Sequence, residues 1–377
     1  MWQSIIPRAN IRQPAATAST EKHHRSPDDP NCTARIDRLC ASSMADYGDD
    51  NGIMATNDSA NLAKRCCVQL NYWEDPFIEC LSRGHGDRKP PEINRGYYAR
   101  VSALTQLINQ LISVIDKTGS PFQIVNLGAG FDTLYWRLKQ LYLSNKKHGP
   151  SATLKAFVEI DMIAVTMHKV HCIRRRGKLL QVLGEDIRFS SSEMHATDYH
   201  LITADLRTVG TTEGAKVLHD KLFKDCALDP EVPTIFLSEC VLVYMEPSFS
   251  GSLLQWISTQ FPKCFHLNYE QVNLNDRFGE VMLDNLHDIH ADLLGLPVCE
   301  SIQTQEQRFT SNGFDEAKSW DMSHIYNQFL PRPEIQRIEK IEFLDERNLL
   351  EQLLSHYCIT VASKGMGHHV RVEDLVH

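Results

Sequence analysis

A glycine turn is the first feature of this chain whose residue types indicate ligand binding. In residues 125–133, Gly128 and Gly130 follow a short apolar run. Glycines at the end of a strand let the backbone turn sharply and approach a ligand, because no Cβ stands in the way. Asp132 lies where a dinucleotide fingerprint would continue toward its third glycine, and its carboxylate would repel a pyrophosphate. The turn therefore disfavours a dinucleotide, whereas a phosphate-free ligand and a turn without any ligand both stay open.

Three acidic residues, Asp161, Asp205 and Glu239, each follow a predicted strand further along the chain. Ligands of open α/β sheets bind outside the carboxyl ends of the strands, where these acids are expected. Asp161 is placed to accept hydrogen bonds from two ribose hydroxyls, and Asp205 from an adenine amine. Glu159 competes with Asp161 on the same face of the strand, but it lies farther from the tip. One such acid is more often a helix cap, but three beside a glycine turn favour S-adenosylmethionine, which carries a sulfonium and no phosphate.

The elements that must position these residues alternate between strands and helices. From Arg100 to Ile115, apolar residues recur at helical spacing, and similar patterns cover residues 247–261, 276–294 and 349–354. We find no internal repeat that would indicate a propeller or a solenoid. The alternation predicts a doubly wound α/β domain with a mostly parallel sheet, an N-terminal helical cap and insertions. The predicted strands cover residues 123–127, 156–160, 200–204, 234–237, 264–269 and 358–362.

Composition excludes several other classes of protein. The net charge of −9 argues against a general nucleic-acid binder, which needs clustered Lys and Arg. No apolar run reaches the roughly 18–20 residues of a membrane span. The 11 cysteines are scattered without a Cys-x-x-Cys pair, which favours reduced thiols in a cytoplasmic protein over a disulfide scaffold or a zinc site.

Residues 1–60 are rich in small and polar residues and lack hydrophobic periodicity. They are predicted to be a disordered extension, and residues 61–377 to form the folded domain. Arg8 and Arg12 without nearby acids weakly suggest a targeting segment. Met44 and Met54 offer the alternative that the extension results from an upstream start.

Several longer blocks resemble the leucine carboxyl methyltransferases, which modify the catalytic subunit of protein phosphatase 2A. The resemblance runs from about Ala63 to Lys364, and several blocks in order make it far more specific than the glycine turn. The blocks are residues 63–65, 71–76, 91–100, 125–139, 238–245, 268–273 and 276–279. Loops at residues 138–157 and 208–233 are longer than is usual in the family.

The resemblance implies a class I S-adenosylmethionine-dependent methyltransferase fold, Rossmann-like and mostly parallel, with extra elements around a substrate pocket. It implies that this chain, acting as a monomer, esterifies the C-terminal leucine of the phosphatase catalytic subunit. It also implies seven cofactor contacts: Lys64, Arg100, Gly128, Asp161, Asp205, Leu206 and Glu239.

Methyl transfer to a carboxylate is an in-line displacement that needs no general base, because an α-carboxyl group is already ionised at neutral pH. The protein has to position the reactants and exclude water. Arg100 is the first candidate to bind the cofactor carboxylate bidentately, with Lys64 second. Arg95 is expected to support the pocket or reach the substrate. Tyr244 is the candidate catalytic residue, as a donor that orients the substrate carboxylate, although a Tyr in an apolar run is more often core.

No metal is expected in this reaction. His287 and His290, with nearby acids, are interpreted as a solvated helix face. Tyr72 and Trp73 are interpreted first as packing under the cap, and second as lining for an apolar substrate side chain.

Two alternative functions stay open at this point. One is an O-methyltransferase that acts on another carboxylate or hydroxyl, in a small molecule or in tRNA; the tRNA-modifying relatives resemble this domain fused to a propeller. The other is a cofactor-binding scaffold for a phosphatase, without turnover.

Overall fold

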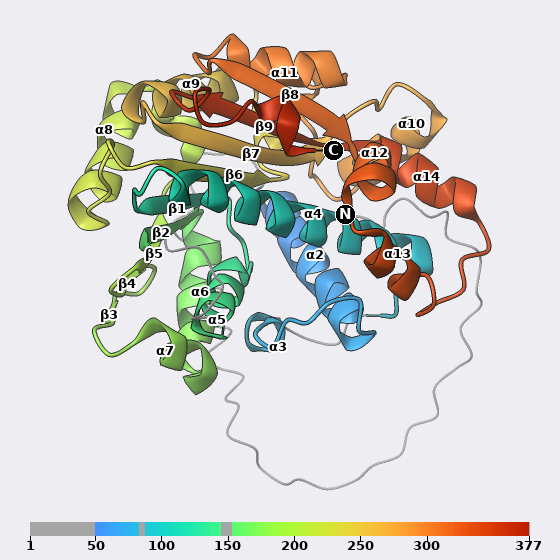
Figure 1. Ribbon diagram of the computed structural model, residues 1–377, viewed down its shortest axis with the longest axis horizontal. Helices are drawn as coiled ribbons and strands as arrows, with labels where there is room; N and C mark the ends of the chain where they lie inside the picture. The colour runs from blue at the N-terminus through green and yellow to red at the C-terminus, as the bar shows by residue number, and fades with distance from the viewer. Residues whose placement is uncertain (1–49, 83–86, 145–152, 377) are drawn as a thin grey trace, which may run out of the picture.

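The computed structural model describes residues 50–82, 87–144 and 153–376 (Figure 1). The predicted disorder of residues 1–49 lies outside this part of the chain. The strands are β1 Phe122–Leu127, β2 Leu154–Asp161, β3 Arg188–Phe189, β4 Met194–His195, β5 Tyr199–Thr203, β6 Thr234–Glu239, β7 Cys264–Gln271, β8 Glu316–Asp321 and β9 Tyr357–Lys364. The α-helices are α2 Asn51–Gln69, α3 Ile78–Leu81, α4 Pro91–Asp116, α5 Leu134–Ser144, α6 Ile163–Arg174, α7 Gly177–Leu183, α8 Thr212–Asp220, α9 Pro247–Gln260, α10 Arg277–His287, α11 Ile302–Thr310, α12 Met322–His324, α13 Arg332–Ile338 and α14 Arg347–Ser355. Short 3₁₀ or π turns are η2 Leu206–Gly210, η3 Lys221–Asp225, η4 Leu242–Tyr244, η5 Leu296–Val298, η6 Ile325–Phe329 and η7 Val372–Leu375.

One mixed sheet forms the centre of the domain, with strand order β3-β4-β5-β2-β1-β6-β7-β9-β8. The central strands β5, β2, β1, β6 and β7 are all parallel. At one side β9 runs antiparallel between β7 and β8, and at the other the short β3 and β4 form an antiparallel edge. The chain order reverses at β1, so ligand binding is expected where β1 separates β2 from β6. The predicted α/β fold with a mostly parallel sheet is confirmed.

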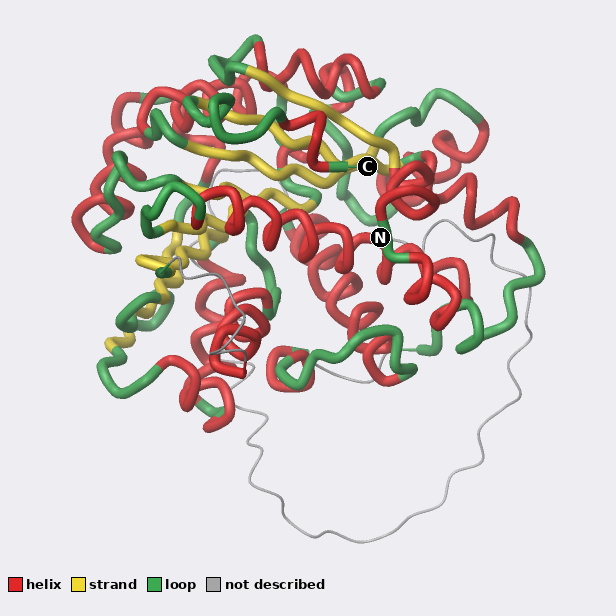
Figure 2. The backbone as a smooth tube through the Cα atoms, viewed as in Figure 1, coloured by secondary structure: helices red, strands yellow, loops and turns green. Residues whose placement is uncertain are grey.

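Helices cover both faces of this sheet, because the central strands are apolar on both (Figure 2). On β1, Ile124 belongs to a core beneath α4, α5 and α14, whereas Val125 belongs to a second core beneath α8 and α9. On β6 the neighbours Ile235 and Phe236 divide in the same way. This alternation is the two-residue period of a strand.

The long helix α4 supports the cap. It begins with Pro91, whose fixed backbone suits the first helical turn, and thus nine residues before the start of the predicted helix at Arg100. All five residues of the predicted apolar stripe are buried: Val101, Leu104, Ile108, Leu111 and Ile115.

The predicted domain boundary at residue 60 is wrong, since α2 already begins at Asn51. Residues 51–60 look like part of the extension because they are polar. Several of their polar groups nevertheless have partners in the domain: the side-chain oxygen of Asn57 accepts a hydrogen bond from the backbone N–H of Phe131 at 3.1 Å. The backbone here is held by tertiary contacts rather than by an apolar stripe.

Two further sequence predictions differ from the structure. The helix predicted for residues 276–294 ends at His287, because His290 takes a left-handed conformation with φ of 56°. Ile289, which lies beyond the end of this helix, is exposed. Strand β8 has no predicted counterpart, because its sequence Glu-Ala-Lys-Ser-Trp-Asp carries the charges typical of an edge strand. None of the described helices is long and apolar enough to cross a membrane.

Candidate active site

A pocket lies at the carboxyl ends of β1, β2 and β6, where the strand order reverses, and residues of α2 line one side of it. The structure brings all eight predicted site residues to its lining. These are Lys64, Arg100, Gly128, Asp161, Asp205, Leu206, Glu239 and Tyr244. They lie on α2, on α4, and at or just after the ends of the four parallel strands β1, β2, β5 and β6. Only the tertiary fold brings them together. Their individual roles stay predictions.

The glycine turn is shaped by close contacts on both sides. Gly128 and Gly130 have φ of 59° and 49°, a conformation that favours glycine. A Cβ on Gly130 would lie 2.2 Å from the side-chain oxygen of Asn57. The N–H of Gly130 donates to the Asp161 carboxylate at 2.7 Å, and the N–H of Met162 donates to its other oxygen at 2.7 Å. Burial raises the pKa of Asp161, although both N–H groups favour its ionised form.

Each oxygen of the Asp161 carboxylate thus has one N–H donor. A carboxylate oxygen has two lone pairs, so both can still accept from ligand hydroxyls. This geometry is compatible with the predicted ribose contact. The competing residue Glu159 does not line the pocket. It is completely buried, with Lys169 Nζ at 2.5 Å.

Glu239 ends β6 between two cations. Lys64 Nζ donates to its Oε1 at 2.8 Å, and Arg100 Nε donates to the same oxygen. Burial by itself would raise the pKa of Glu239, but Arg100 and Lys64 outweigh it and lower that pKa to about 2. The carboxylate is therefore ionised at neutral pH, and the three side chains together carry one net positive charge.

Arg100 lies with its guanidinium 4.7 Å from the centre of the Tyr269 ring and is only 4% exposed. Within the described part of the chain Arg100 makes its hydrogen bonds through Nε alone. Its two terminal nitrogens are therefore available to a ligand in the pocket. The neighbouring Cys240 forms the turn after Glu239 with φ of 57°, and its N–H donates to the Tyr269 carbonyl at 2.7 Å. A buried cation with available donors suits the carboxylate of an amino-acid ligand.

Asp205 is already paired in this structure. Its carboxylate accepts from the Arg207 N–H at 3.0 Å and from the Arg207 guanidinium at 2.9 Å. The same guanidinium binds Asp50 through two nitrogens, at 2.8 and 2.9 Å. Asp50 and Arg207 both line the pocket, and sequence reasoning missed them. Arg207 lies only two residues beyond Asp205, a usable signal, whereas Asp50 was hidden in the polar segment assigned to the extension.

Tyr244 lies in η4 and is 6% exposed. Its hydroxyl hydrogen-bonds with Thr56 of α2 and Gln271 at the end of β7. Burial raises its pKa, so the phenol keeps its proton at neutral pH and can act as a hydrogen-bond donor. The structure therefore fits the orienting role predicted for Tyr244 and gives it no role as a base.

Other residues singled out from the sequence lie outside the pocket. The Arg95 guanidinium donates to the backbone carbonyl of Glu342 at 2.9 Å, so it ties α4 to the segment after α13. Tyr72 is buried with its hydroxyl on Glu342, and Trp73 borders a separate surface groove. His287 pairs with Asp292 at 2.8 Å on an exposed face, in agreement with the solvated-face interpretation.

The fold and the pocket define a class I methyltransferase: a parallel sheet with a glycine turn after β1, acids at the next strand tips, and a cationic end. The leucine carboxyl methyltransferase family model matches residues 54–258. The chain is 41% identical to leucine carboxyl methyltransferase 1 of Bos taurus, covering 87% of this chain and 94% of the relative. It is 40% identical to the Caenorhabditis elegans enzyme of the same name, covering 83% and 92%.

This chain therefore belongs to the leucine carboxyl methyltransferase family. It is also 32% identical to tRNA wybutosine-synthesizing protein 4 of Homo sapiens, but it spans only 44% of that protein. Membership of this family implies S-adenosylmethionine as the methyl donor. The pocket residues fit such a group, since they offer carboxylates near a glycine turn and a net positive charge near Arg100.

Proposed function

We propose that this protein transfers a methyl group from S-adenosylmethionine to the C-terminal leucine carboxylate of the protein phosphatase 2A catalytic subunit. The observation that carries the proposal is the match over nearly the whole length of leucine carboxyl methyltransferase 1. The pocket supports it, because all eight predicted site residues line one cavity. The cofactor residues would be Lys64, Arg100, Gly128, Asp161, Asp205, Leu206 and Glu239.

The chemistry asks little of the protein beyond placement. When bound, S-adenosylmethionine supplies an activated methyl group. The substrate carboxylate is ionised at neutral pH and needs no base. Arg100 and Lys64 would hold the amino-acid end of the cofactor, and Asp161 and Asp205 its adenosine. Tyr244 would donate a hydrogen bond to one substrate oxygen and leave the other to react, after moving its hydroxyl from Thr56 or Gln271.

The sequence identities weigh against the tRNA alternative. The chain is 41% identical to leucine carboxyl methyltransferase 1 of Bos taurus, but 32% identical to the relative named for wybutosine synthesis. A cofactor-binding scaffold without turnover would keep the same cation pair, so the result that would favour it is binding of S-adenosylmethionine without methyl transfer to a competent phosphatase subunit. We further propose that the protein acts as a monomer in the cytoplasm.

The test is methylation of purified phosphatase catalytic subunit with methyl-labelled S-adenosylmethionine. The matched control is the same subunit lacking its final leucine. We expect a base-labile ester on the intact subunit and none on the shortened one. Labelling of both subunits, or of a small molecule or tRNA instead, would contradict the proposal.

A further inference from the structure

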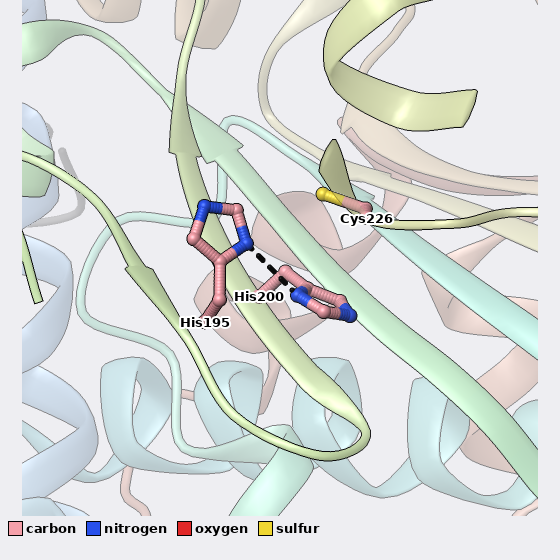
Figure 3. Close-up of side chains that lie close together, drawn as sticks. All are labelled: His195, His200 and Cys226. Atoms are coloured by element: carbon pink, nitrogen blue, oxygen red, sulfur yellow. Dashed lines mark hydrogen bonds between the residues drawn. The ribbon is translucent and has the colours of Figure 1, made fainter. Parts of the chain in front are cut away.

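Three metal-ligating side chains meet at a place remote from the pocket lining. They are His195 on β4, His200 on β5, and Cys226 just after η3 (Figure 3). One ligand atom from each lies within 4.8 Å of the others. None of the three lines the candidate active site, and the proposed methyl transfer does not use them.

The two histidines form a cross-strand pair on the antiparallel edge of the sheet. Their Nδ1 atoms are 3.0 Å apart and face each other, as the dashed line in Figure 3 marks. Two imidazole nitrogens on one tetrahedral zinc ion lie roughly 3.3 Å apart, given Zn–N bonds of about 2.0 Å. The pair is therefore close to the spacing of two ligands, and the two rings, which now share a hydrogen bond, would turn so that both nitrogens point at one ion.

Cys226 completes the cluster from another part of the chain. It is 2% exposed, and its N–H donates to the carbonyl of Lys221 at 3.0 Å, which fixes the backbone at the end of η3. The three ligand atoms lie within 4.8 Å of one another, whereas bonds of about 2.3 Å and 2.0 Å to one tetrahedral zinc ion require an S–N separation of roughly 3.5 Å, so the thiol would move inward on binding. The set of two imidazoles and one thiol is the type of ligand set that zinc prefers. Metal binding by Cys226 releases the thiol proton to solvent as the sulfur–metal bond forms.

We propose that His195, His200 and Cys226 form a zinc site with three protein ligands and one position open to water. His195 is partly exposed, which gives the ion and that water a route in. The lack of a Cys-x-x-Cys pair disfavours a zinc site when the sequence is taken alone. The structure makes the site from residues whose spacing, five and then 26 positions, matches no common motif.

The site would fasten the segment before β6 to the edge of the sheet. Cys226 lies in the long segment between β5 and β6, whereas both histidines belong to the sheet edge. A second link already joins the same parts, because Lys221 of η3 pairs with Glu193, whose carboxylate also accepts the Thr203 N–H at 3.0 Å. Zinc binding is thus expected to raise thermal stability rather than to change catalysis.

The experiment uses the full-length protein after removal of metal with a chelator. One equivalent of Zn²⁺ should bind and raise the melting temperature, and Co²⁺ as a probe should give a thiolate charge-transfer band with the visible bands of a tetrahedral ion. Cys226→Ser should remove the charge-transfer band and weaken Zn²⁺ binding by more than the roughly tenfold to hundredfold that loss of an outer-shell partner costs. His195→Ala should weaken it as well. Cys80→Ser, at a thiol outside the cluster, is the control and should behave like the unaltered protein.

Failure to bind one equivalent of Zn²⁺, or a charge-transfer band that persists in Cys226→Ser, would overturn the proposal. If Cys226→Ser does not fold, X-ray absorption of the unaltered zinc-loaded protein decides. A first shell with one sulfur and two imidazoles supports the site, and a shell lacking either ligand type overturns it.

Discussion

Two glutamates, on parallel strands that β1 separates, behave in opposite ways. Glu239 at the tip of β6 has two cations, Lys64 and Arg100, and its pKa is lowered to about 2. Glu159 inside β2 has one cation, Lys169, and a hydrogen bond from the Tyr199 hydroxyl at 2.6 Å. Burial raises the pKa of Glu159 to about 7 despite Lys169.

The difference shows how a charged group that can bind a ligand is distinguished from one that only stabilises the fold. The group at Glu239 lies at a strand end, lines the pocket and carries a net positive charge that a ligand carboxylate can balance. The group at Glu159 lies two residues before its strand end, has no contact with the pocket and is balanced within itself. The first should matter for binding and the second for stability.

The largest expected effect comes from Lys169→Met, which leaves Glu159 buried without its cation. Breaking a buried pair in this way costs about 3–5 kcal/mol of stability. Urea unfolding should show that loss, while the affinity of the folded protein for S-adenosylmethionine changes little. A large loss of affinity with unchanged stability would remove the distinction between the two glutamates.

Arg100→Ala should lower the affinity for S-adenosylmethionine while changing the stability of the fold little. Removing a buried charge partner of a ligand costs about 2–5 kcal/mol, so S-adenosylmethionine affinity should fall at least about thirtyfold in calorimetry, and turnover with it. The protein should still fold, because Glu239 keeps Lys64. Arg332→Ala, at an exposed arginine that begins α13, is the control. Near-normal activity of Arg100→Ala would show that the carboxylate assignment is wrong.

The two glutamates also predict opposite responses to pH. The folded-state pKa of Glu159 lies above its ordinary value of 4.5, so the folded protein keeps a proton that the unfolded chain has lost. Stability from this group therefore falls as pH rises from about 4.5 to 7, by at most about 3 kcal/mol. For Glu239 the folded pKa is lowered, so its contribution is present above about 4.5 and is lost as pH falls toward 2.

Urea unfolding of the unaltered protein and of Glu159→Gln at several pH values measures the first effect. Between pH 4.5 and 7 the unfolding free energy of the unaltered protein should fall relative to that of Glu159→Gln. Above pH 7 the difference between the two proteins should stay constant. A difference that is flat across this range would mean that Glu159 is ionised throughout.

The smallest effect is expected for Gly130→Ala. Both the left-handed backbone and the contact with Asn57 oppose a Cβ, and backbone strain of this kind costs about 1–3 kcal/mol. Affinity for the cofactor should fall roughly tenfold. Gly119→Ala is a matched control, since Gly119 also has positive φ, 73°, but nothing lies within 4 Å of its Cβ position. Equal loss of cofactor affinity in both variants would mean that the turn is not a ligand contact.

Much of the fold was predictable because the central strands are short apolar runs between helical patterns. Strands β1, β2, β5, β6, β7 and β9 lie within a residue or two of the predicted ranges at most of their ends. The predictions failed where neighbours decide the structure. The edge strand β8 is charged, and the first half of α2 is polar, so neither has a local signal.

The candidate site divides in the same way. Asp161, Asp205 and Glu239 could be found because an acid after a buried strand must lie at one edge of a parallel sheet. The partners that set their charge states could not. Lys64 lies on α2, 175 residues before Glu239. Asp50 is linked to Asp205 through the Arg207 guanidinium, which binds both carboxylates.

The sequence alone determined the parallel sheet, the glycine turn, the acids at the strand ends and membership of the methyltransferase family. These follow from local periodicity and from blocks of residues that need no knowledge of contacts. Only the tertiary structure decided which charges are paired, that α2 closes the pocket, and that two histidines meet Cys226. Electrostatic and metal-ligand interactions depend on distances of a few ångströms between segments far apart in the chain, and the fold alone sets those distances.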